Sequence, residues 1–375
     1  MDERSCYIFL NLLSLGYRTA LKLKTEFGSL SEAVSADKQA LLAVHGIRKN
    51  SAESIVSKRG MPLVEKELEL ADKSGFTVLT VGDEEYPQPL KNIDSPPLVL
   101  YINGTLTDQD ASAIAIVGTR KPTSYGKTVA FNAGYDLAAQ GVTVVSGLAT
   151  GLDTEAHRGA LKAEGRTLAV LGSGLLRLYP RENEKLARKI IGQGAVISEF
   201  PLETEPFRSN FPIRNRVISG LSSGTIVVEA AAKSGSLITA GFAAEQGRTV
   251  FAVPGNIDQP TSSGANRLIN QGAVLYESVE DVFRELPYLR RKKNVTAEHP
   301  TDMKKSDVSL SSEEKKVVTL LSKKPLHIDE LTEASDFNAP QLSVLLLTLE
   351  MKKVVAQLPG KYYTLSQNLV TLELT

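Results

Sequence analysis

IAIVGTRKPTSYGKT, residues 114–128, has the pattern of a strand, a loop and the start of a helix. The apolar run from Ile114 to Val117 has the side chains of a strand that is buried on both faces. Gly118 opens a basic loop, and a helix begins near Gly126. Because the free N–H groups at the start of a helix bind phosphate, this order of elements predicts a phosphate-binding turn.

Six further runs of this kind follow up to residue 276, and helical stretches separate them. Five of the runs follow one repeated junction, in which Gln or Glu closes a helix and Gly comes next, as in QGVTVVSG and QGAVLYES. Gly at that position adopts the left-handed conformation that ends a helix. The alternation predicts an α/β fold: a Rossmann-like, doubly wound and mostly parallel sheet over residues 81–286. The seven runs are AIAIV, VTVV, TLAVL, AVIS, TIVVE, TVFAV and AVLY.

The segments on both sides of this region have other patterns. Residues 1–80 carry apolar residues at spacings of three and four, which predicts a helical domain of the SAM or helix-hairpin-helix kind. Its stretch LLAVHGIRKNSAESI, residues 41–55, either presents N–H groups to a phosphate or is an ordinary helical turn. Residues 287–310 are polar and charged and predict a linker. Residues 311–375 predict a winged helix, with three helices and a hairpin that turns at Pro359 and Gly360.

The overall charge is balanced, with 43 Lys and Arg against 43 Asp and Glu. A nucleic-acid site would therefore be a local patch. The single cysteine, Cys6, excludes an internal disulfide framework and a Cys-rich zinc site, which fits a reducing compartment. The acidic N-terminus is unlike a signal peptide, and no apolar run is long enough to span a membrane. We expect a cytoplasmic protein with no membrane association.

The turns at the carboxyl ends of the predicted strands are rich in Gly, Ser, Thr and cations. Ligands of doubly wound sheets bind at these ends. Five aromatic residues lie in or beside the turns, Tyr125, Tyr179, Phe200, Phe207 and Phe211, and we expect most of them to pack in the core. Arg216 is one more cation of these turns. The predicted binding site consists of Gly118, Thr119, Arg120, Lys121, Ser146, Gly147, Gly172, Gly174, Arg181, Arg214, Lys233, Ser234, Gly235, Ser236 and Arg267.

Two nucleotide motifs are excluded by their spacing. A P-loop would end in the Gly-Lys-Thr of residues 126–128, but Lys121 occupies the position that requires the first Gly. A dinucleotide fingerprint would begin in LGSGLLR, but Arg177 occupies the place of its third Gly. ATP hydrolysis and nicotinamide or flavin binding are therefore not predicted, and we expect no cofactor.

Candidate catalysts are few. Glu229 in SSGTIVVEA lies one residue beyond the Glu of the phosphoribohydrolase motif, so an enzyme that acts on a nucleotide through Arg120 and Glu229 is the alternative function. Asp153 and His157 are four residues apart on a predicted helix, and Ser146 precedes them. A capping Asp153 and a packed or hydrogen-bonded His157 are favoured over an acid–base pair or half of a metal site. No second His is nearby, so neither metal-dependent hydrolysis nor a serine nucleophile is predicted.

An edge lined with N–H donors and cations suits an extended polyanion such as single-stranded nucleic acid. The central region also resembles the DprA/Smf family of bacterial DNA-processing proteins. The resemblance runs through eight ordered blocks over roughly 160 residues, among them IAIVGTRKPTSYG, VVSGLATGLDTEAHRGAL, FPIRNRVISGLS and VVEAAAKSGSLITA.

The resemblance implies a protein that binds single-stranded DNA without cutting it, forms a homodimer through its Rossmann-like domain and helps to load RecA recombinase in natural transformation. The family's Gly-Ser/Thr-Arg turn corresponds to Gly118, Thr119 and Arg120, and its basic residue after Tyr-Pro corresponds to Arg181.

The third helix of the predicted winged helix, APQLSVLLLTLEMKK, has no cation before Lys352. A helix that reads a major groove normally carries cations to the DNA. A structural or protein-contact role is therefore favoured, with DNA contact through Lys361 of the wing as the alternative. A third hypothesis for the whole chain is an interaction scaffold in which the winged helix dominates.

Overall fold

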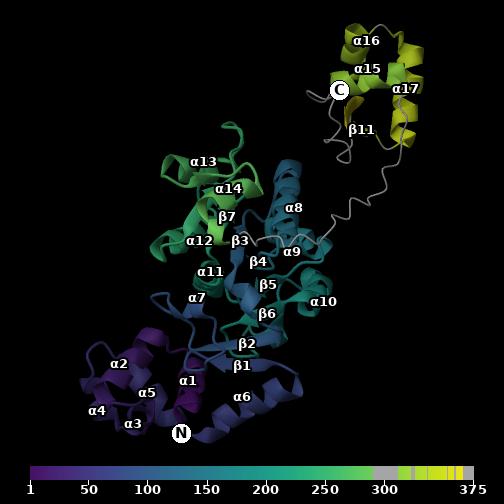
Figure 1. The fold of residues 1–375 in the computed structure, drawn as a ribbon. Coiled ribbons are helices and arrows are strands. Elements are labelled where there is room, and N and C mark those ends of the chain that lie inside the picture. Colours follow the sequence, from purple (N-terminus) through teal and green to yellow (C-terminus); the bar gives the residue numbers. More distant parts are fainter. Residues whose placement is uncertain (290–310, 322–325, 336, 353, 359, 366–375) are drawn as a thin grey trace. The chain divides into compact units, whose positions relative to one another are not determined.

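The computed structural model describes residues 1–289, 311–321, 326–335, 337–352, 354–358 and 360–365 (Figure 1). Residues 1–292 form one compact unit and residues 293–375 a second. The first unit contains a group of helices and a nine-stranded sheet, and the second contains helices and a three-stranded sheet. None of the described helices is both long and apolar enough to cross a membrane.

Six helices open the first unit, as their spacing of apolar residues predicts. The side chains of Asp2, Ser29 and Asp37 begin three of them by accepting a hydrogen bond from an N–H of the first turn. Between the fourth and fifth helices Gly46 has a φ of 81°, which Gly adopts without strain. Phosphate binding at this turn stays a prediction. The helices are α1 (Glu3–Leu12), α2 (Tyr17–Phe27), α3 (Leu30–Ser35), α4 (Lys38–Ala43), α5 (Lys49–Lys58) and α6 (Met61–Lys73).

The sheet has the order β1-β2-β6-β5-β4-β3-β7-β8-β9. From β6 to β9 all neighbours are parallel, which confirms the predicted fold class. Two antiparallel strands at one edge, β1 and β2, were not predicted, and β1 lies within the range expected to be helical. The strands are β1 (Thr77–Thr80), β2 (Val99–Gly104), β3 (Ala113–Val117), β4 (Thr143–Ser146), β5 (Thr167–Val170), β6 (Ala195–Ser198), β7 (Gly224–Val227), β8 (Thr249–Ala252) and β9 (Val274–Leu275).

The connections between strands reverse direction once. Helices α8 (Ser124–Ala139), α9 (Leu152–Lys162) and α10 (Glu184–Gln193) lead stepwise from β3 to β6, whereas α11 (Asn210–Gly220) returns to β7 and α12 (Gly235–Glu245) continues outward. Because such crossovers are right-handed, the two groups of helices cover opposite faces (Figure 1). The reversal falls between β3 and β7, so a ligand crevice is expected at their carboxyl ends. The remaining elements of this unit are α7 (Gln88–Lys91), α13 (Ser263–Asn270), α14 (Val279–Glu285), η1 (Asp108–Ala111), η2 (Leu175–Arg177), η3 (Arg181–Asn183) and η4 (Pro287–Leu289).

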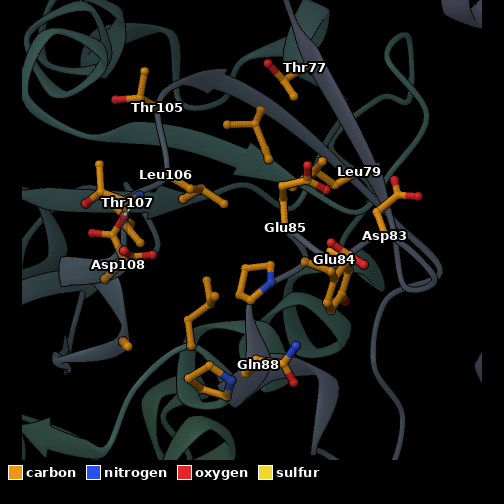
Figure 2. A pocket seen from close by; sticks show the side chains of 18 of the residues that line it. Thr77, Leu79, Asp83, Glu84, Glu85, Gln88, Thr105, Leu106, Thr107 and Asp108 are labelled. Carbon is orange, nitrogen blue, oxygen red and sulfur yellow. Dashed lines mark hydrogen bonds between the residues drawn. The ribbon is translucent and has the colours of Figure 1, made fainter.

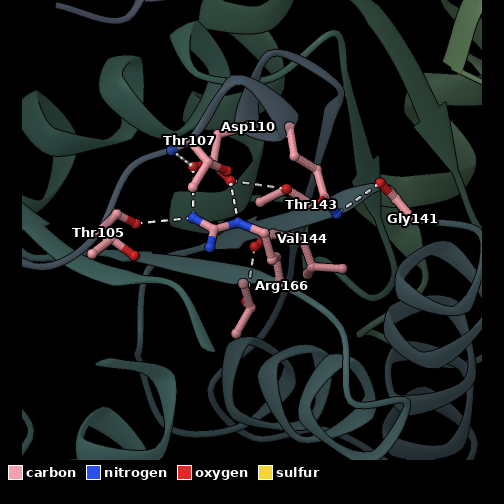
Figure 3. Close-up of polar contacts among 9 residues, drawn as sticks. Thr105, Thr107, Asp110, Gly141, Thr143, Val144 and Arg166 are labelled. Carbon is pink, nitrogen blue, oxygen red and sulfur yellow. Dashed lines mark hydrogen bonds and ion pairs between the residues drawn. The ribbon is translucent and has the colours of Figure 1, made fainter. Parts of the chain in front are cut away.

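A polar network holds the β2–β3 connection against the sheet (Figure 3). Asp110 in η1 accepts hydrogen bonds from Arg166 Nε at 3.0 Å and Nη2 at 2.7 Å, and Arg166 also donates to the carbonyl of Thr105 at 2.9 Å. The Thr143 hydroxyl donates to Asp110 at 3.0 Å. The charged side chains are only 17% and 10% exposed. This shielded ion pair therefore joins the unpredicted edge of the sheet to its parallel centre.

The second unit has the fold predicted for it. Three helices enclose a core that contains Val317, Leu331, Leu342 and Leu346, and a hairpin of β11 and β12 forms the wing. A short strand that was not predicted, β10, pairs with β12. Its elements are α15 (Ser312–Leu321), β10 (Leu326–His327), α16 (Ile328–Ala334), α17 (Ala339–Met351), β11 (Val355–Leu358) and β12 (Tyr362–Leu365).

Several domain-level predictions fall wholly or partly outside the described residues. Of the predicted linker, residues 287–289 are described, and they form η4 with Leu289 buried. Residues 290–310 and Pro359 of the predicted hairpin turn are not among the described residues. The domain boundaries after residues 80, 286 and 310 stay a prediction.

Replacing Arg166 with Ala should lower the free energy of unfolding of the first unit by about 3 kcal/mol, because Asp110 is then left shielded from water without its partner. Urea denaturation followed by far-UV circular dichroism measures the change. Arg18→Ala is the control, since Arg18 and Asp94 form an exposed pair with side chains 72% and 78% exposed and should contribute less than about 1 kcal/mol. Equal losses in the two variants would contradict the role given to the network.

Candidate nucleic-acid interface

A pocket of about 280 Å³ opens at the carboxyl ends of β3 and β7, where the sheet topology predicts a ligand crevice. The β3–α8 turn, the start of α9, α11 and the start of α12 form its walls. Six of the predicted site residues line it: Gly118, Arg120, Arg214, Ser234, Gly235 and Ser236. The sheet thus brings together residues that are more than 100 positions apart in the chain.

Phe211, at the start of α11, lies at the centre of an aromatic and cationic cluster beside this pocket. The guanidinium carbon of Arg120 lies 5.2 Å from the centre of the Phe211 ring, in a cation–π arrangement. The centre of the Tyr179 ring lies 5.8 Å from that of the Phe211 ring, and the two rings are tilted by 59°. Gly172 leaves room for the ring, since a Cβ there would lie 2.8 Å from it. Arg120, Gly147, Tyr179 and Phe211 also line a small hollow next to the pocket.

The expectation that most of the five aromatic residues pack in the core is wrong. Tyr125, Tyr179 and Phe207 are exposed, with Phe207 the most open at 61%. Phe200 and Phe211 are half-buried. They follow strand ends, where the chain turns outward, so their rings are available at the same edge as the cations.

Arg214, one of the predicted binding cations, is a buried residue at the base of the pocket. It is only 4% exposed, and its Nη1 donates to the carbonyl of Gly147 at 2.8 Å and to that of Val170. Burial lowers the pKa of Arg214 to about 10, against the opposing effect of Asp153, so it stays charged at neutral pH. Gly147 permits this contact, because a Cβ there would lie 2.8 Å from the guanidinium. One arginine therefore ties the ends of β4 and β5 together.

Asp153 organises the loop that precedes α9. Its carboxylate accepts hydrogen bonds from the N–H groups of Gly147 at 3.1 Å and Ala149 at 3.3 Å. Burial raises the pKa of Asp153, while Arg214 and these two hydrogen bonds act in the opposite direction. The N-cap of α9 is Gly151, so the prediction that Asp153 caps this helix is corrected. Asp153 lies in the first turn of α9, and its carboxylate binds N–H groups of the preceding loop.

His157 is a packed, hydrogen-bonded residue, as predicted. Thr167 gives its only hydroxyl hydrogen to the carbonyl of Val144 at 2.8 Å. Its oxygen can therefore only accept from His157 Nδ1, 2.7 Å away, which assigns the proton to Nδ1. Nε2 is buried and has no hydrogen-bond partner among the residues that the structure describes. Burial, reinforced by Arg214, lowers the pKa of His157 to about 3.

Other predicted residues use their polar groups in hydrogen bonds or ion pairs within the fold. The Ser146 hydroxyl is buried and donates to the carbonyl of Ile116 at 2.6 Å, and the N–H of Gly174 donates to Thr204 at 2.9 Å. The N–H of Thr119 donates to the carbonyl of Glu229 at 2.8 Å. Arg216 forms a shielded ion pair with Glu199, whose pKa is raised by burial. The structure therefore does not place these groups free at the pocket surface.

The remaining predicted cations are exposed on the turns of the same edge. Lys121 follows Arg120, and Arg181 begins η3 directly after Tyr179 and Pro180. Lys233 precedes α12, and Arg267 of α13 donates to the carbonyl of Ala232 at 3.5 Å. None of these four cations lines the pocket.

Glu229, the candidate of the alternative enzymatic function, is buried and orders the β3–α8 turn. Its Oε1 accepts from the hydroxyl of Thr123 at 2.5 Å and its Oε2 from the N–H of the same residue at 3.0 Å. Thr123 in turn caps α8 by accepting from the N–H of Gly126 at 3.1 Å. Glu229 does not line the 280 Å³ pocket. Its carboxylate therefore has a structural task in this conformation.

A cavity of about 870 Å³ beside β1 and β2 has the opposite charge (Figure 2). Its lining includes five carboxylates, Asp83, Glu84, Glu85, Asp108 and Asp110, against the single cation Arg4, which pairs with Asp83 at 3.4 Å. It lies at the amino ends of the parallel strands. A phosphate would be repelled there, so the smaller pocket is the candidate site although the acidic cavity is larger.

The winged-helix unit shows little of a groove-reading surface among its described residues. On α17, Val344 and Leu347 are exposed by 65% and 60%. Lys352, which follows α17, donates to both carboxylate oxygens of Glu314 at 2.7 and 2.8 Å. The sequence hypothesis of a structural or protein-contact role stays a prediction that these contacts support.

Fold and pocket together define a Rossmann-like protein whose switch-point crevice is lined with cations and an aromatic ring. The family model of DNA recombination-mediator protein A matches residues 77–287, and that of the DprA winged helix domain matches residues 301–361. The chain belongs to the DNA recombination-mediator protein A family.

Individual relatives agree with this assignment. DNA processing protein DprA of Bacillus subtilis is 46% identical over 216 residues, which cover 57% of this chain and 73% of the relative. Protein Smf of Escherichia coli is 37% identical over 304 residues, or 80% of this chain and 81% of the relative. The X-ray structure of DprA from Streptococcus pneumoniae has a TM-score of 0.66 at 32% identity and covers 76% of this chain and 98% of that one. A DprA structure from Helicobacter pylori, described for its single-stranded DNA binding mode, has a TM-score of 0.52 at 29% identity and covers 58% and 97%.

The buried His157 should make stability depend on pH. Between pH 6.5 and 3 the unfolded chain binds a proton on this imidazole and the folded chain does not, so the free energy of unfolding should fall by about 1.4 kcal/mol per pH unit on acidification. His157→Asn should remove this contribution, as measured by urea titrations between pH 7.5 and 5. Parallel profiles for the wild type and His157→Asn would contradict the assignment.

Proposed function

We propose that this chain binds single-stranded DNA at the carboxyl edge of its sheet, independently of sequence, and holds it without cleaving it. The observation that carries the proposal is the Phe211 ring, with Arg120 over it and Tyr179 beside it, at the mouth of a pocket that contains Arg214. Cations that follow the phosphates and aromatic rings that stack on bases are the two elements of single-strand recognition. Family membership supports the same ligand, because a DprA of this fold has a described single-stranded DNA binding mode.

The geometry favours a single strand over a duplex. Stacking on Phe211 or Tyr179 requires the open face of a base, which a duplex hides between its neighbours. The pocket has a volume of about 280 Å³, which suits a short piece of one strand and is too small for a double helix. A cation contacts the phosphate, which is the same in every nucleotide, and all four bases can stack on the face of a ring. Little sequence preference is therefore expected.

The contacts of the candidate catalytic residues support DNA binding without hydrolysis of the strand. Glu229 receives both of its hydrogen bonds from Thr123. His157 is buried with a pKa of about 3, and the Ser146 hydroxyl donates to a backbone carbonyl. These three candidate catalytic groups support the fold around the site instead. We therefore propose a non-catalytic protein that needs no cofactor.

The wider role that we propose is that of a cytoplasmic homodimer that helps RecA to assemble on incoming single strands. It is supported by membership of a family of recombination mediators. RecA filament nucleation on strands already bound by the protein should be faster than on strands coated with a single-strand-binding protein alone. An unchanged nucleation rate would remove this part of the proposal and leave DNA binding untouched.

Replacing Arg120 with Ala should weaken the binding of all single-stranded sequences alike. If one phosphate contact is lost, the slope of the logarithm of affinity against the logarithm of salt concentration should decrease in magnitude by about 0.7. Mobility shifts at several salt concentrations measure both quantities. The same titration with duplex DNA should show weaker binding by the wild type.

Arg18→Ala is the matched control, because it removes an exposed arginine from α2, within the helical segment that precedes the sheet. An unchanged affinity and slope in Arg120→Ala would remove Arg120 from the site. Equal affinity of the wild type for single and double strands would overturn the proposed function.

A further inference from the structure

A basic groove of about 850 Å³ lies between α9 and α10, apart from the pocket at the switch point. Its lining contains five cations, Arg158, Lys162, Lys185, Arg188 and Lys189, and one carboxylate, Glu182. The chain as a whole carries equal numbers of cations and carboxylates. The imbalance in the groove is therefore a local feature that favours an anionic ligand.

Three of the five cations are not neutralised by ion pairs within the described part of the chain. Arg158 pairs with Glu155 at 2.9 Å and Arg188 with Glu184 at 2.5 Å. Lys162, Lys185 and Lys189 are exposed and have no such partner among the described residues. These ammonium groups can bind phosphates without first breaking an ion pair.

The floor of the groove is apolar. Phe131 of α8, Leu161 of α9 and Leu186 of α10 line it. Phe131 and Leu161 are half-buried, and Leu186 is buried. An apolar floor between cationic rims suits a chain that carries both phosphates and apolar base or sugar faces. A free inorganic anion would make no use of such a floor.

The groove and the hollow beside the proposed DNA pocket are lined by neighbouring residues of the connection between β5 and α10. Tyr179 and Pro180 line the hollow beside Arg120, and Glu182 and Asn183, only two residues further on, line the groove. Asn183 is buried and donates to the carbonyl of Leu148 at 2.8 Å and to the hydroxyl of Thr154 at 2.9 Å. These bonds fix the upper end of the groove to the β4–α9 loop, whose residues also line the hollow.

The direction of the helices continues this path. Both α9 and α10 start at the carboxyl edge of the sheet and run toward its amino edge along the same face (Figure 1). The ten residues of α10 correspond to a track of roughly 15 Å. Arg181, exposed at the start of η3, lies between the two sites in the chain.

We propose that a single strand held at the switch-point pocket continues over Arg181 into the groove between α9 and α10, where Lys162, Lys185 and Lys189 bind its backbone. This inference rests on the proposed function and extends the same site. It makes the binding site an extended track, so affinity grows with strand length until the groove is filled.

The test uses the full chain with Lys162→Gln, Lys185→Gln and Lys189→Gln combined. Fluorescein-labelled oligothymidylates of about 5 and about 20 nucleotides, which fit the pocket alone and the whole track, are the probes. The variant should bind the short probe as the wild type does. Each lost phosphate contact lowers the magnitude of the slope of log affinity against log salt concentration by about 0.7. For the long probe the loss of three contacts should therefore lower the slope by about 2 and the affinity at 0.1 M salt about 100-fold.

Two further variants make the result decisive. Lys58→Gln, Lys66→Gln and Lys73→Gln combined remove the same charge from exposed positions of α5 and α6 and should leave both probes unaffected. Replacing the three groove lysines with Arg keeps the charge and should preserve binding of the long probe.

The possible failures can be told apart. If the wild type binds neither probe, the proposed function itself is wrong. If the wild type binds both, but the groove variant matches the control or loses both probes equally, the groove is not part of the track and the pocket remains the whole site.

Discussion

The buried guanidinium of Arg214 is the contact on which the pocket depends. It joins the carbonyls at the ends of β4 and β5, and it lies 5.8 Å from the centre of the Phe211 ring. A buried cation is costly unless hydrogen bonds and a nearby carboxylate offset its desolvation, and here the carbonyls and Asp153 do so. The same charge that organises the loops also lines the pocket, so the loop geometry and the positive charge of the pocket have one source.

The neutral composition of the chain conceals a separation of charge within its first unit. Cations surround the carboxyl edge and continue between α9 and α10, whereas carboxylates line the cavity beside β1 and β2 at the opposite edge. A net charge near zero exerts little long-range attraction, but separated patches orient an approaching polyanion. A strand would be drawn to the cationic edge and repelled from the acidic one.

The sequence predicted the sheet because the helix ends and strand starts carry a repeated local signal. The edge strands β1 and β2 lack that junction, and they are held by long-range contacts such as Asp110 with Arg166, which no local pattern reveals. At the site, the Gly118 turn, Arg120 and the Ser234 to Ser236 segment were predicted because pocket residues follow strand ends. The burial of Arg214 and the exposure of Tyr179 were not, since both depend on how α11 packs against loops far away in the chain.

The β3–α8 turn begins like a nucleotide site, and its contacts support the proposal that it holds an anion without reacting with it. A hydrolytic site needs a free carboxylate or a metal ligand near the phosphate. The buried carboxylate of Glu229, which follows β7, accepts two hydrogen bonds from Thr123 of this turn, and Thr123 starts α8. The Glu229 carboxylate, which could otherwise activate a water molecule, fixes the loop instead. The fixed loop keeps Arg120 in place over Phe211. Because Arg120 is already held in position over the ring, binding a flexible strand would cost less conformational entropy. This contribution strengthens DNA binding and does not require catalysis.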